Sequence, residues 1–244
     1  MGERKQWSRL DNAAKIYPPT STNRDTKVFR FVCELTEPVD GAVLQYALEQ
    51  TMKEFPLYRS VLKKGLFWHY LEESNLMPRV TEEALPVCSS IYNADKHGLL
   101  FRVHYFKHRV NLEVFHALAD GAGVLQFFRT MVFQYLKEKY AISGEMTDYD
   151  ASPHQRSQDA FYKYYDKDGS IPKEKRYRAY RIRGERLADH KIGITEGFMS
   201  TKAVLEKAHE HSATLSELLI ALLVRSIHDD MAVRERARPV VIAV

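Results

Sequence analysis

The stretch VFHALADGAG, residues 114–123, places a histidine at the end of an apolar run and an Asp-Gly pair four residues later. Val114 and Phe115 close a segment whose apolar and aromatic composition predicts a strand over 109–117. The glycines that follow tolerate unusual backbone conformations and allow a ligand to approach the main chain closely. We therefore expect a rigid strand that delivers a histidine to a tight turn.

His116 is the candidate general base of this stretch. An imidazole with its usual pKa of roughly 6.5 can take a proton from a hydroxyl, amine or thiol at neutral pH. Asp120 can hydrogen-bond within the turn or pair with an arginine, and so fix the loop. The unpaired N–H groups of a following helix over 123–140 would favour negative charge. A strand-end histidine and an Asp-Gly turn are also common structural features, so a purely structural His116 is the alternative.

Composition limits the classes of protein to consider. With 244 residues, 45% of them hydrophobic, the chain can bury a sizeable core. A formal net charge of +4 is compatible with an anionic ligand. Cys33 and Cys88 form no metal or redox motif, and no stretch reads as a signal peptide or a membrane span. We expect a cytoplasmic protein with reduced cysteines and no membrane span.

The remaining patterns predict a mixed α/β fold with a largely antiparallel sheet flanked by helices. Strands are expected over 26–35, 65–73, 99–108 and 109–117, and the last two should pair as a hairpin. Helices are expected from Asp40 to Pro56, over 123–140, near 200–211, and from a capping box of Thr214 and Glu217. The segment RPVVIAV, 238–244, has the composition of a buried strand. Residues 141–190 form a polar excursion rich in tyrosine and arginine.

HALADG, His116 to Gly121, resembles the HxxxDG motif of the chloramphenicol acetyltransferase-like superfamily, which includes alcohol acyltransferases and the condensation domains of peptide synthetases. WSRLDNAAKIYP (7–18) resembles the superfamily's opening segment, and LQYALEQTMKEFPLYRSVL (44–62) its first helix. The late helix and strand of the N-terminal half are similar to residues 214–227 and 238–244. The resemblance implies a chloramphenicol acetyltransferase-like half-fold made of 1–140 and 191–244, with 141–190 as an insertion.

The resemblance also implies an acyltransferase. His116 would deprotonate a hydroxyl or amine acceptor for attack on an acyl thioester. The thioester would be an acyl-CoA or an acyl group on the phosphopantetheine of an acyl carrier protein. Asp120 would fix the loop through an arginine, and Gly121 would allow the tight turn. No metal and no tightly bound cofactor are implied, and the thioester is a co-substrate. A single rather than a doubled histidine favours an alcohol O-acyltransferase-like enzyme over peptide condensation.

Besides the single histidine, the length of this chain departs from the superfamily and leaves alternatives open. Superfamily members with two halves in one chain are roughly twice as long as this chain. We therefore expect that the chain is a fragment, or that a second copy (a homo-oligomer) or a second half-domain is its partner. A binding scaffold without turnover is the other alternative. Nucleic-acid binding through the arginines and tyrosines of 173–186 is a third reading. A solvated linker is the better interpretation of that charge run. His104 and His108 would lie too far apart on a strand to share a metal.

Overall fold

The computed structural model describes residues 7–144, 177–185, 187–189 and 191–242. Internal contacts divide the chain into two compact units. The first comprises Met1–Asp166 with Ala188–Ile192, and the second comprises Lys167–Leu187 with Gly193–Val244. Each unit is described by itself, so the expected grouping of 1–140 with 191–244 stays a prediction.

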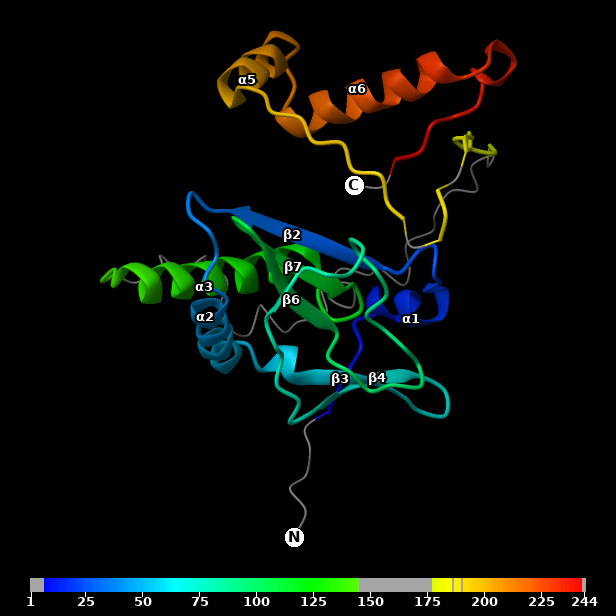
Figure 1. The fold of residues 1–244 in the computed structure, drawn as a ribbon. Coiled ribbons are helices and arrows are strands. Elements are labelled where there is room, and N and C mark those ends of the chain that lie inside the picture. Colours follow the sequence, from blue (N-terminus) through cyan, green and yellow to red (C-terminus); the bar gives the residue numbers. More distant parts are fainter. Residues whose placement is uncertain (1–6, 145–176, 186, 190, 243–244) are drawn as a thin grey trace. The chain divides into compact units, whose positions relative to one another are not determined.

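The described residues of the first unit form two sheets and two long helices (Figure 1). Its strands are β1 (Trp7–Arg9), β2 (Val28–Glu34), β3 (Ser60–Lys64), β4 (His69–Glu73), β5 (Thr81–Glu82), β6 (Phe101–Phe106) and β7 (Arg109–Phe115). Its helices are η1 (Ala14–Ile16), α1 (Tyr17–Thr20), α2 (Gly41–Glu54), η2 (Pro56–Arg59) and α3 (Gly121–Tyr140).

The larger sheet has the order β2-β7-β6-β5 and is antiparallel except for the β5–β6 pair. The predicted β6–β7 hairpin is confirmed, with Phe106 opposite Arg109 and a left-handed Lys107 (φ 52) in its turn. β7 is therefore a central strand, paired on both edges along its length. This position fixes where the chain leaves the sheet at Phe115, and so it fixes the place of His116.

The smaller sheet, β1-β4-β3, was only partly predicted. The strand expected over 65–73 begins at His69, because residues 65–68 form the tip of a hairpin. In that tip the Gly65 amide donates to the Trp68 carbonyl oxygen over 2.7 Å. The short strands β1 and β3 have too few residues for a clear alternation of polar and apolar side chains.

Helices α2 and α3 pack against each other, and α3 also contacts β2. The side chain of Asp40 accepts from the Ala42 and Val43 amides, which confirms the predicted N-cap of α2. The helical faces that bury against the sheet match the apolar spacing in the sequence. The hydrophobic residues at least 99% buried on the two helices are Leu44, Ala47, Leu48, Met52, Val124, Phe127, Met131 and Tyr135.

The second unit contains α5 (Thr201–Glu210), α6 (Leu215–Asp230) and η4 (Val233–Glu235). The predicted capping box at the start of α6 is confirmed, since Thr214 and Glu217 each accept from the other's main chain. The predicted strand at 238–244 is wrong over its described part, because 238–242 form no strand and Val241 is 75% exposed. Its β-branched composition alone cannot form a ladder without a neighbouring strand.

Candidate functional site

His116 is the first residue after β7. Its amide donates to the Lys27 carbonyl oxygen over 2.8 Å, which continues the β2–β7 pairing by one residue. The Leu118 amide then donates to the Phe115 carbonyl oxygen over 2.9 Å, which closes a turn around His116. The histidine is thus anchored by a complete ladder on one side and by a turn on the other, as the sequence predicts.

The ring of His116 is half-buried between two aromatic side chains. Tyr17 of α1 stacks on it with centroids 4.4 Å apart and an interplanar angle of 14°. Phe29 of β2 lies 4.7 Å away at 51°. Among the described residues no side chain hydrogen-bonds the ring nitrogens. The imidazole is therefore held by packing between two aromatic rings.

Asp120 fixes the turn as the N-cap of α3. Its Oδ1 accepts from the Gly123 amide over 2.8 Å, and its carbonyl oxygen accepts from Val124 over 3.0 Å. The sequence offered a hydrogen bond within the turn or a pair with an arginine, and the structure gives the first. A Cβ at position 123 would lie 3.3 Å from the Asp120 carboxylate, so a glycine there suits the cap.

Gly121 has a different place from the one predicted. It is the first residue of α3, and α3 begins two residues before the expected start. Its φ is not positive, and an added Cβ would meet nothing within 4 Å. The turn therefore does not require glycine at this position. The space beside Gly121, at the first turn of α3 and next to the Asp120 cap, is instead open among the described residues.

A buried group of charged residues lies at the centre of the same sheet, and the sequence analysis missed it. Glu113, in the middle of β7, has no exposed surface. Its Oε1 accepts from Arg30 Nε over 2.8 Å and from the Cys88 amide over 2.7 Å. Its Oε2 accepts from Arg102 Nε over 2.6 Å, and Arg30 Nη2 also reaches Glu83 over 2.5 Å. We call these four charged residues, Arg30, Glu83, Arg102 and Glu113, the ion cluster.

The ion cluster is electrostatically matched. Burial would raise the pKa of Glu113, but the Cys88 amide and the two arginines hold that pKa below its usual value. The two carboxylates in turn keep the pKa of Arg30 raised in spite of its burial. His104 lies beside the cluster, and burial lowers its pKa. His104 is thus a buried histidine of the core, and Glu113 is a fixed anion.

A signal for the ion cluster is present in the sequence. A charged residue interrupts the apolar pattern at the centre of three predicted strands, as Arg30, Arg102 and Glu113. The observed register places these three side by side. For Tyr17 and Phe29 no such signal exists, because their contact with His116 joins three distant parts of the chain.

The basic segment at 173–186 is described only for 177–185. These residues include no strand or helix, and Arg183 Nη2 lies 3.5 Å from Glu235 Oε1 in the same unit. One of the arginines considered for nucleic acid is therefore engaged in an ion pair. The preference for a solvated linker stays a prediction.

No protein-family model matches the sequence. No curated protein sequence matches it significantly. Solved structures do match. A variant of the starter condensation domain of rhizomide synthetase RzmA, in complex with C8-CoA, gives a TM-score of 0.51 at 14% identity. The match covers 65% of this chain and 42% of that chain, so this chain spans less than half of that domain's length.

Two further matches are with other domains of peptide synthesis. The epimerization domain of the third module of tyrocidine synthetase B gives a TM-score of 0.47 at 15% identity, over 60% of this chain and 39% of its own. The X-domain of teicoplanin biosynthesis, in complex with OxyB, gives 0.46 at 17% identity, over 60% and 36%. The RzmA likeness confirms the predicted chloramphenicol acetyltransferase-like half-fold, and it concerns the fold alone.

Proposed function

We propose that this chain, with its condensation-domain half-fold, transfers an acyl group from a thioester to a hydroxyl or amine acceptor. His116 acts as the general base. The observation that carries the proposal is the setting of His116: it follows a fully paired central strand, and Tyr17 stacks on its ring at 4.4 Å. A general base must be held in one orientation, and the paired strand and the stacked tyrosine ring support this.

The proposed reaction balances without a covalent enzyme intermediate. His116 takes the proton from the acceptor O–H or N–H, and the acceptor atom attacks the thioester carbonyl carbon. The carbon–sulfur bond then breaks, and the thiolate leaves and is protonated. The N-terminal amides of α3 lie a few residues along the chain and favour developing negative charge.

The donor that fits best is an acyl-CoA. This choice rests on the RzmA structure, which holds C8-CoA, and on the net positive charge of the chain. A phosphopantetheine thioester on a carrier protein would offer the same reacting atoms. We favour an alcohol acceptor because one histidine rather than two opens the HxxxDG-like motif.

The second candidate is a binding half-domain without turnover. The observation that favours it is length: this chain spans 42% of the matched RzmA domain. In that case the stacking of Tyr17 on His116 would only stabilise the fold. A second copy or a separate half-domain could also complete an active site, and activity would then depend on that partner.

The experiment is a product assay by mass spectrometry. The chain is incubated with mixed acyl-CoA thioesters and with pools of alcohols and amines. His116→Phe is the informative variant, because it keeps an aromatic ring between Tyr17 and Phe29 but cannot carry a proton. His97→Ala, at an exposed histidine, is the matched control.

We expect acylated product from the wild type and from His97→Ala, and none above background from His116→Phe. A folded His116→Phe variant with full activity would refute the general base. A wild type that binds acyl-CoA in calorimetry but yields no product at any protein concentration would favour the binding half-domain.

A further inference from the structure

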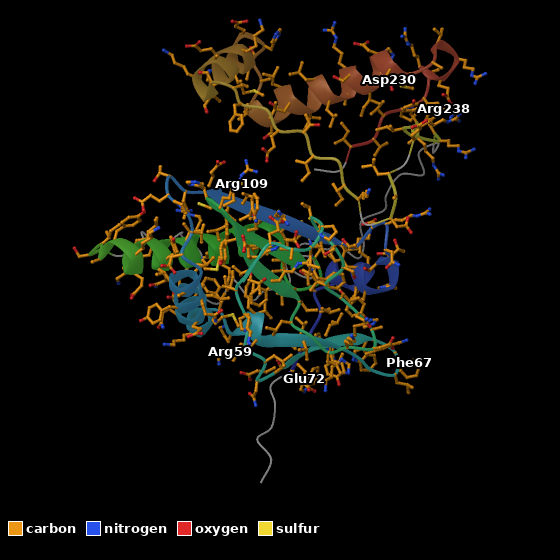
Figure 2. All side chains as sticks on the ribbon, in the orientation of Figure 1. Arg59, Phe67, Glu72, Arg109, Asp230 and Arg238 are labelled. Atoms are coloured by element: carbon orange, nitrogen blue, oxygen red, sulfur yellow. The ribbon has the colours of Figure 1, made fainter. Side chains whose placement is uncertain are left out.

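The tip of the β3–β4 hairpin carries three consecutive apolar side chains in solvent. Leu66, Phe67 and Trp68 are 88%, 82% and 57% exposed. Figure 2 shows Phe67 at the outer end of this hairpin. Single exposed apolar residues are normal on protein surfaces, but a contiguous group of large ones marks an interaction site.

The hairpin holds this tip in place. β3 and β4 pair over five residues up to Lys64 opposite His69, and the bond from the Gly65 amide to the Trp68 carbonyl oxygen closes the turn. Behind the tip, Leu62 and Leu71 face each other and are both 4% exposed. The base of the hairpin is therefore anchored in the core. The tip cannot turn inward to bury its side chains without breaking the β3–β4 ladder.

The charges next to the tip are mostly positive. Lys64 precedes the turn and is exposed, and Arg9 lies on β1 opposite Tyr70, one residue further from the tip than the last β3–β4 pair. Lys63 is neutralised by Glu72 over 2.8 Å. Glu73 lies at the other end of β4. An anionic surface that approaches the tip would meet the exposed side chains of Lys64 and Arg9.

We propose that residues 64–68 insert into the headgroup interface of an anionic phospholipid membrane. Tryptophan and phenylalanine beside lysine and arginine are the side chains that settle at this interface. The proposal does not rest on the proposed function. No described helix is long and apolar enough to cross a bilayer.

The small area of the tip argues against a protein partner. Three side chains of this size offer on the order of 500 Å². A stable protein interface needs roughly 800 Å² from each partner, in a surface of matching shape. Insertion into lipid needs no matching surface, and a narrow protruding tip suits it better than a broad interface.

The test uses the full chain and vesicles of phosphatidylcholine, with or without phosphatidylglycerol. The sequence contains two tryptophans, so Trp7→Phe leaves Trp68 as the only indole. We expect the emission of Trp68 to shift to the blue with anionic vesicles, and the protein to sediment with them. Brominated lipids should quench this emission.

The deciding variant is Leu66→Ser with Phe67→Ser. Its matched control is Leu76→Ser with Met77→Ser, an adjacent exposed pair outside any strand, at 45% and 59% exposure. We expect the tip variant to lose roughly tenfold or more in vesicle partitioning, and the control to lose little. Lys64→Glu should lower partitioning into anionic vesicles roughly tenfold and leave neutral vesicles unaffected.

Three results would overturn the proposal. One is no shift and no sedimentation with anionic vesicles at low salt. Another is an equal loss of partitioning in the tip and control variants. The third is a blue shift of Trp68 that grows with protein concentration without lipid, since a second copy of this chain would then cover the tip.

Discussion

The centre and the end of β7 use polar side chains in opposite ways. At the centre, Glu113 is fully buried and both of its carboxylate oxygens accept hydrogen bonds. Three residues later, His116 is half-buried, and the described contacts of its ring are with aromatic faces. The centre is closed to a ligand because its polar atoms are engaged. At the end of the strand, no described side chain hydrogen-bonds the ring of His116, so we expect chemistry at His116 and a contribution to stability from Glu113.

The largest expected effect is on catalysis. His116→Ala should lower kcat/KM for the proposed acyl transfer by roughly 10²–10⁴-fold, because no base then takes the proton from the attacking hydroxyl or amine. Its free energy of unfolding should fall by only about 1 kcal/mol, the contribution of the lost ring contacts. Steady-state kinetics and urea unfolding measure the two quantities. A collapse of the fold with His116→Ala would instead mean that both regions of β7 are structural.

The next effect is on stability. Glu113→Gln should lower the free energy of unfolding by about 3–5 kcal/mol, because Arg30 and Arg102 would stay buried without their anion. Glu34→Gln is the matched control, since Glu34 is 59% exposed and lies 3.4 Å from Arg109. A surface pair of this kind contributes at most about 1 kcal/mol. Similar losses in the two variants, measured by urea unfolding, would remove the contrast.

Acid should weaken the centre of the strand in a defined direction. The pKa of Glu113 in the folded protein lies below its ordinary 4.5, so its contribution to stability is present above that value. This contribution is lost as the pH falls through the lower, folded pKa. Urea unfolding between neutral pH and pH ~3 should therefore show a steeper acid loss for the wild type than for Glu113→Gln. Parallel pH profiles would contradict the assignment.

The smallest effect concerns the turn after His116. Asp120→Ala should cost about 1 kcal/mol of stability, because α3 loses its N-cap acceptor. Asp120→Asn should cost less than half of this, since asparagine also caps through its side-chain oxygen. If asparagine proved as harmful as alanine, the charge of Asp120 would matter, and the pair with an arginine that the sequence suggested would regain support.

Several elements of both units could be predicted from local patterns. The β6–β7 hairpin, the N-cap at Asp40 and the capping box at Thr214 follow from residues close together in the sequence, and all three were found. The strand expected at 238–244 failed in its described part because a strand exists only through a partner. The tip at 65–68 was read as strand because apolar composition does not separate a buried strand from an exposed turn.

The sequence by itself determined that a strand runs up to His116 and that an Asp-Gly turn follows four residues later, since both features depend on neighbours along the chain. That Asp120 caps α3 came from the structure. Only the tertiary structure decided what surrounds these residues. The stacking of Tyr17 on His116 and the contact of Arg30 and Arg102 with Glu113 join segments separated by 11 to 99 positions. Local patterns mark the charged positions at the strand centres but do not show which side chains meet, because these contacts arise from strand register and helix placement once the core has packed.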